Sequence, residues 1–278
     1  MKKLFSFFQR KLPLLLILAV GLVPLRWFKN NLLIAGGDLP IPLDPAAGKF
    51  IGSFLYTWYP YLYGGEVNPH QFAIFPWFGF WALLKSLGSS LLLINKLWFI
   101  FVFTLSGVSM YYLVSVVFKK ANPVLLFVAP LFYMFNVYVV VMTPIVATPL
   151  LYGALPLILG LYIKGLDERE NSSRYAVLVA LSSLLICAAI GNPPIYAILG
   201  IMLFTYYLFY LVTNPRKDVV FSLIFIFKIG IWYFLLNLWW FYPFLINVLF
   251  HSGDLAEAVV SSGFGRSFQA VSQSKKCQ

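Results

Sequence analysis

The sequence predicts an all-α protein, a polytopic transmembrane helical bundle with about seven spans and a first outer loop that lies along the membrane surface. Two observations predict this class. Of the 278 residues, 61% are hydrophobic and only 10% are charged. The apolar residues also gather in several stretches of about 18 residues or more, the length that crosses a bilayer as a helix. A membrane β-barrel would instead show alternating segments of about ten residues, and the sequence has none.

The net charge of +11 is explained by membrane topology and not by nucleic-acid binding. The basic residues cluster in short loops between the apolar stretches, and such loops remain in the cytoplasm. The cysteines indicate neither a disulfide framework nor a metal site, because Cys187 falls inside an apolar stretch and Cys277 is one residue from the end. We therefore expect membrane lipid, and no nucleic acid, among the partners.

The first span is expected from Leu12 to Phe28, an apolar run that only Arg26 interrupts. Four basic residues precede it within the first eleven positions. A cleaved signal peptide is the alternative, but no clear small-residue cleavage site follows the run directly. We prefer an uncleaved first helix with its amino terminus in the cytoplasm.

The first outer loop is expected at about residues 29–90. Its first part, 30–70, is irregular, with five prolines, two Gly-Gly pairs and an aromatic run at 56–63. Tryptophan and tyrosine favour the headgroup level, so this part is expected on the membrane surface. The apolar stretch 71–87 contains Pro76 and Gly79 and either spans the membrane or lies at its interface. If it spanned, the later basic loops would fall outside, so the positive-inside rule favours a re-entrant or interfacial segment.

Six further spans are expected, which places the carboxyl terminus outside. Residues 1–250 then form a transmembrane module, and the small and polar residues 251–278 form an outer tail. This tail is either disordered or the truncated start of a further region. The six expected spans are Leu91–Phe118, Pro123–Met142, Ile145–Ile163, Tyr175–Ile190, Ile195–Val212 and Val219–Phe250.

The few acids are informative in such a chain, because each must be solvated, paired or used in function. All nine fall in predicted loops, and five of them share the predicted outer side with both histidines. Asp38 follows the pair Gly36-Gly37, and Asp44 comes six positions later. A carboxylate at a water-accessible rim can act as a general base. The alternative is an ordinary solvated turn in which Asp44-Pro45 starts a helix. The five outer acids are Asp38, Asp44, Glu66, Asp254 and Glu257.

Other polar residues are candidates for substrate binding. Glu66 and His70 flank Asn68-Pro69 and could contact a metal or an acceptor hydroxyl, although two residues are too few for a metal site. Lys228 lies about ten residues into the last span, where it either reaches toward the interface or lines a cavity. The outer basic residues could bind a lipid-linked phosphate or could simply reach past the helix ends to the interface. They are Arg26, Lys29, Lys49, Lys85, Lys96 and Arg266.

The order of these parts resembles the GT-C superfamily of membrane glycosyltransferases. Within it, the chain looks most like the amino-terminal part of the large arabinofuranosyltransferase-related and YfhO-like proteins. These proteins usually have more helices and often an outer carbohydrate-binding domain. The resemblance rests on Gly36-Gly37-Asp38, Asp44-Pro45, Trp58-Tyr59-Pro60, Gly64-Gly65, Phe75-Pro76-Trp77 and the string from Asn237 to Pro243.

This resemblance implies transfer of a sugar from a polyprenyl-phosphate donor to a glycan or lipid acceptor at the outer face. Asp38 would be the base, with Asp44 as its alternative or helper, and the acceptor would attack with inversion. Cations or a divalent metal would take the charge of the leaving phosphate. The competing hypotheses are a lipid or sugar transporter or flippase and a noncatalytic membrane assembly partner. The substrate-binding candidates are Glu66, His70, Lys49, Lys96 and Arg266.

Overall fold

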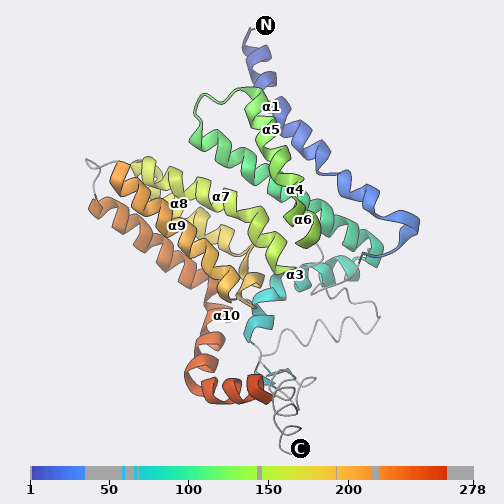
Figure 1. Ribbon diagram of the computed structural model, residues 1–278, viewed down its shortest axis with the longest axis vertical. Helices are drawn as coiled ribbons and strands as arrows, with labels where there is room; N and C mark the ends of the chain where they lie inside the picture. Colours follow the sequence, from blue (N-terminus) through green and yellow to red (C-terminus); the bar gives the residue numbers. More distant parts are fainter. Residues whose placement is uncertain are drawn as a thin grey trace, which may run out of the picture.

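The computed structural model describes residues 2–34, 58–59, 66–67, 69–142, 146–191, 193–213 and 219–261. These residues are mostly helical (Figure 1). The two short strands β1 (Trp58–Tyr59) and β2 (Glu66–Val67) pair antiparallel, with Trp58 opposite Val67. The α-helices are α1 (Lys2–Val20), α3 (Pro69–Ser86), α4 (Leu91–Val117), α5 (Pro123–Met134), α6 (Val137–Met142), α7 (Ala147–Asp167), α8 (Ser172–Ser183), α9 (Pro193–Thr213) and α10 (Val219–Ser261). The 3₁₀ segments are η1 (Val23–Trp27), η2 (Lys29–Asn31), η3 (Arg169–Asn171) and η4 (Cys187–Gly191).

Four helices in the described part of the chain are long and apolar enough to cross a membrane. This confirms the expectation of a helical membrane protein, while the count of seven spans remains a prediction. The apolar stretch 71–87 forms the single helix α3, which continues through Pro76 and does not belong to these four. The four candidate spans are Leu91–Val117, Thr148–Asp167, Tyr196–Thr213 and Val219–Ile246.

Glycines allow the central helices α4 and α7 to approach closely. A Cβ atom added to Gly153 would lie 3.2 Å from Leu105 Cδ2, and one added to Gly160 would lie 2.9 Å from Tyr112 Cδ1. Small residues at helix contacts are typical of membrane proteins, where packing replaces the hydrophobic effect as the driving force. The Ser109 hydroxyl of α4 also donates to the backbone carbonyl of Gly153. These contacts make α4 and α7 parallel neighbours.

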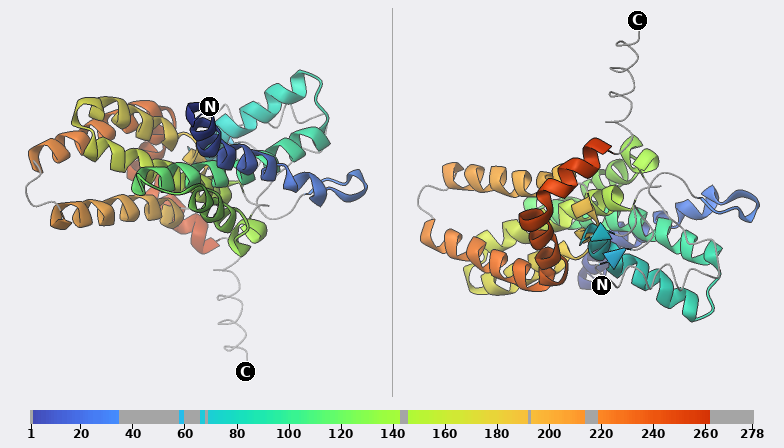
Figure 2. Two further views of the ribbon diagram at one scale, coloured as in Figure 1. Left: turned by 90° about the horizontal axis from the view of Figure 1, so that it is seen from above. Right: turned by 90° about the horizontal axis from the view of Figure 1, so that it is seen from below.

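The helix directions sort the charged loops to one end of the bundle. Because α4 and α7 run in parallel, Lys119 and Lys120 after α4 lie at the same end as the charged segment 164–174, which begins in the last turn of α7. We call this the basic end. The opposite end carries η1, η2 and the turn between α3 and α4, which lie together on the right of Figure 1 and of both views in Figure 2. We call it the tryptophan end, after the residues described below.

Two expected spans are interrupted. The stretch 123–142 forms α5 and α6 instead of one helix, because the Asn136 side chain accepts a hydrogen bond from the backbone N–H of Tyr138 at 2.9 Å and starts a new turn. The stretch 175–190 also forms only the short helix α8, followed by η4. There Ser183 donates from its hydroxyl to the carbonyl of Ala180 at 2.6 Å, at the last residue of the helix.

The first and last helices differ from expectation at their ends. α1 stops at Val20, before Gly21, and Pro24 occupies the start of η1, so the expected span to Phe28 is not one helix. α10 does not stop at Phe250 but continues to Ser261, because the segment from Asp254 to Ala258 is rich in good helix formers. Figure 1 shows that the last part of α10 turns away from the bundle.

Candidate functional site

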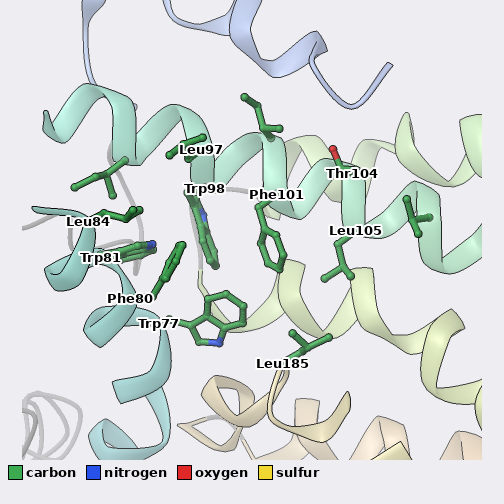
Figure 3. A pocket seen from close by; sticks show the side chains of 13 residues that line it. Trp77, Phe80, Trp81, Leu84, Leu97, Trp98, Phe101, Thr104, Leu105 and Leu185 are labelled. Atoms are coloured by element: carbon green, nitrogen blue, oxygen red, sulfur yellow. The ribbon is translucent and has the colours of Figure 1, made fainter. Parts of the chain in front are cut away.

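An apolar pocket of about 690 Å³ lies between α3 and α4, and we call it the tryptophan pocket (Figure 3). Ligand pockets in proteins commonly measure about 300–1,000 Å³. The indole of Trp98 packs edge-on against Trp77 and Trp81, with ring centroids 5.6 and 5.1 Å apart. The side chains that line the pocket are Trp77, Phe80, Trp81 and Leu84 of α3, several residues of α4 between Ile94 and Val108, and Leu185.

The pocket is elongated along α4 and open on one side. Its lining on α4 extends from Ile94 to Val108, which corresponds to about 21 Å along a helix that rises about 1.5 Å per residue. The hydrocarbon core of a bilayer is about 30 Å thick. Phe80, Leu97 and Phe101 are 50%, 38% and 37% exposed, so one wall of the pocket meets the surroundings of the bundle. An apolar chain can therefore enter the pocket from this side.

The lining offers almost no hydrogen-bonding group. Thr104 has the only hydroxyl among the lining side chains. The indole nitrogens of Trp77 and Trp98 are covered by neighbouring atoms and have no hydrogen-bond partner. The tryptophans therefore present ring surface to the pocket, and this chemistry selects an apolar ligand over a polar one.

Asn95 attaches the start of the first loop to α4. Its Oδ1 accepts a hydrogen bond from the backbone N–H of Ile34 at 2.9 Å, and its Nδ2 donates to the carbonyl of Ile34 at 3.2 Å. The side chain is only 3% exposed. Ile34 is the last described residue before the segment that contains Asp38, and Asn95 follows Ile94 of the pocket. The loop therefore leaves the bundle beside the tryptophan pocket.

Four basic residues lie at this same end. Lys96 of α4 is half-buried, with its Nζ 5.8 Å from the centre of the Phe28 ring. Arg26, Lys29 and Lys85 are exposed. The acids whose side chains the structure describes all lie in the segment 167–170 at the basic end. Within that part of the chain, no carboxylate therefore neutralises these cations.

The predicted catalytic pair lies outside the described residues, as do Lys49 and Arg266. Glu66 lies in β2 and His70 in the first turn of α3, where the structure describes the backbone alone. Among the described residues, no three of the types His, Cys, Asp and Glu come close enough to hold a metal ion. Of the predicted catalytic and substrate-binding residues, Lys96 is thus the one with a described side chain. It precedes Leu97 of the pocket lining in the chain, and its ammonium lies over the ring of Phe28.

The sequence analysis did not single out Asn95 or the pocket tryptophans. Asn95 gives a recognisable signal, because it and Lys96 are the only polar residues in the first three turns of α4. The tryptophans give none on their own, since their role depends on α3 lying against α4. Comparisons with known proteins find no protein family, no curated protein and no solved structure that matches this chain.

Lys228 reaches a hydroxyl at the basic end. Its Nζ donates to Ser173 Oγ at 2.8 Å, in the first turn of α8. Of the two possibilities for Lys228, reaching toward the interface or lining a cavity, this contact favours the first. In the same region, Glu168 accepts from the Tyr175 hydroxyl at 2.9 Å, and its Oε1 lies 3.6 Å from Lys164 Nζ.

Proposed function

We propose that the protein is a membrane glycosyltransferase, or the amino-terminal part of one, that uses a polyprenyl-phosphate sugar at the outer face. The observation that carries this proposal is the tryptophan pocket, which lies beside cations that have no described carboxylate partner. A lipid-linked sugar donor has these two needs. Its chain requires apolar surface, and its phosphate requires positive charge when it becomes the leaving group.

The chain of the donor occupies the tryptophan pocket, and its phosphate lies toward Lys96. Asp38 is the base that deprotonates the acceptor hydroxyl. It follows Ile34 by four residues, and four extended residues span at most about 14 Å, so the Asn95 attachment keeps this acid near the phosphate. Asp44 is the alternative base or a helper. A divalent metal is a further candidate for neutralising the phosphate charge.

The remaining residues of the site contact the donor or the acceptor, which is a glycan or a lipid. They are Glu66, His70, Lys49 and Arg266. The proposal also includes seven spans, with the amino terminus in the cytoplasm and the carboxyl terminus outside. The gathering of Lys119, Lys120 and the segment 164–174 at one end supports this orientation, because basic loops remain inside.

The test uses the purified protein in liposomes with a polyprenyl-phosphate sugar and an acceptor, both on the outer face. A new glycosidic bond without an ion gradient is the expected result. The Asp38→Asn variant should lose about 10²–10⁴ in rate, the usual scale for a general base. If Asp44→Asn loses this rate and Asp38→Asn does not, the two roles are exchanged. Solute accumulation that requires an ion gradient, without any glycosidic bond, would overturn the proposal in favour of a transporter.

A further inference from the structure

A second charged site lies at the basic end, on the face of α10 that meets lipid. The ammonium of Lys228 donates to Ser173 Oγ at 2.8 Å. The apolar residues around it on α10, Ile224, Phe227 and Ile231, are 48%, 69% and 43% exposed. Lys228 therefore lies at the boundary between the helices and lipid, and not in the protein interior.

No carboxylate in the described part of the chain pairs with Lys228. Glu168, in the same region, is already engaged by Lys164 at 3.6 Å and by the Tyr175 hydroxyl at 2.9 Å. An ammonium has three N–H donors, and the described contacts use one of them. Lys228 thus has donors and a positive charge available for an acceptor outside the protein.

The pairing of α8 with α10 sets the depth of this lysine. Ser173 contacts Lys228, and Ser183, ten residues later, accepts from Asn237 Nδ2 at 2.9 Å. The two helices therefore run in parallel, and Lys228 is level with the first turn of α8. That turn directly follows the charged residues 167–170. This is the depth at which lipid phosphates are expected, since a charged turn marks the edge of the apolar core.

The other charged groups near this turn are of both signs. Arg169, whose guanidinium lies 5.0 Å from the centre of the Phe221 ring, and Arg174 are exposed, as are the carboxylates of Asp167 and Glu170. With Glu168 held by Lys164, the arginines and Lys228 leave an excess of positive charge on this face. Basic side chains at this level attract the anionic lipids of the cytoplasmic leaflet.

We propose that Lys228 and Ser173 bind the phosphate of an anionic glycerophospholipid in the leaflet at the basic end. The ammonium and the serine hydroxyl donate to phosphate oxygens, and the exposed apolar residues of α10 contact the acyl chains. This site lies at the opposite end of the bundle from the tryptophan pocket. It does not depend on the proposed sugar transfer.

The experiment is native mass spectrometry of the purified full chain with phosphatidylglycerol or phosphatidylcholine of identical acyl chains. The unchanged protein should retain phosphatidylglycerol preferentially. Lys228→Met should weaken its binding about tenfold, because a hydrogen bond to a charged group is lost. Lys228→Arg should preserve the preference, and so should Lys119→Met, which removes an exposed lysine elsewhere at the basic end.

Equal retention of the two lipids by the unchanged protein would overturn the proposal, as would an undiminished preference in Lys228→Met. If Lys228→Met does not fold, Ser173→Ala provides the same comparison, since Ser173 is exposed and contributes only its hydroxyl. Its binding of phosphatidylglycerol should be weaker than that of the unchanged protein. If Ser173→Ala binds phosphatidylglycerol as strongly as Lys119→Met does, the result would decide against the site.

Discussion

Asn95 is the residue whose side-chain chemistry holds the start of the first loop against α4. An amide buried in an apolar helix costs free energy unless its donor and acceptor are both satisfied. Here both are used by one residue, Ile34, which lies 61 positions earlier in the chain. These two hydrogen bonds therefore satisfy the Asn95 amide, and they also fix the segment before Asp38 against α4.

Replacing Asn95 by leucine should detach this segment. The expected loss of unfolding free energy is about 1–3 kcal/mol, because the backbone groups of Ile34 lose their partner. Hydrogen exchange at the amide of Ile34 should become faster in the variant. Asn122→Ala is the matched control, since Asn122 caps α5 and has no contact with this segment. Unchanged protection of Ile34 in Asn95→Leu would show that other contacts hold the segment.

At the scale of a helix, Gly165 allows α7 to pack closely against α10. A Cβ atom at Gly165 would overlap the ring of Phe225, which is fully buried. Gly165→Ala should therefore force apart α7 and α10 and cost about 1–3 kcal/mol of unfolding free energy. Gly200→Ala in α9 is the control, because its Cβ would have no neighbour within 4 Å. That change should be neutral or stabilising by up to about 1 kcal/mol. Thermal unfolding in detergent compares the two, and equal effects would contradict this packing.

The turn between α7 and α8 predicts a dependence of stability on pH. The hydrogen bond from the Tyr175 hydroxyl, aided by Lys164, lowers the pKa of the Glu168 carboxyl in the folded protein. In the unfolded protein the pKa of a glutamate is about 4.3, so the stability that comes from this lowered pKa is fully present above that pH. It is lost as the pH falls through the folded pKa.

The Tyr175→Phe variant tests this coupling directly. It should raise the pKa of Glu168 toward its ordinary value and weaken the dependence of stability on pH below about 5. Thermal unfolding at a series of pH values, or direct titration of the carboxyl by NMR, measures the change. Lys120→Met, which alters an exposed lysine away from Glu168, should leave the profile unchanged. Identical profiles for Tyr175→Phe and the unchanged protein would show that the hydroxyl has no such effect.

The helices were predictable from sequence where apolar length alone decides, as in α4, α7 and α9, but their interruptions were not. The end of α8 depends on Ser183, whose hydroxyl bonds to Ala180 and accepts from Asn237, 54 residues away. A local sequence pattern cannot show a contact between residues so far apart in the chain.

The candidate site was likewise predictable only in part. Lys96 was expected as an outer cation, but the tryptophan pocket exists only because α3 packs against α4.

At the scale of the whole molecule, the structure divides the charges between two ends. The basic end contains Lys119, Lys120 and the segment 164–174, and the tryptophan end contains η1, η2, the turn between α3 and α4, and the pocket. A membrane protein keeps its basic loops in the cytoplasm. The pocket, the Asn95 attachment and the chain that leads to Asp38 should then all face outside, where a lipid-linked sugar and its acceptor can meet.

Cysteine labelling in intact cells tests this orientation. Cys277 is first replaced by serine, while the buried Cys187 is kept because it cannot react. Cysteines introduced at Asp44 and Glu257 should react with an impermeant thiol reagent from outside, and one at Glu168 should react only after the membrane is permeabilised. Labelling at Glu168 in intact cells would contradict the seven-span arrangement and move the basic end outside. Labelling at Asp44 but not at Glu257 would instead place these two positions on opposite sides of the membrane. The chain would then cross the membrane an odd number of times between them, and not the six times of the seven-span arrangement. In that case α3, the one helix whose crossing the sequence leaves open, would be the first helix to examine.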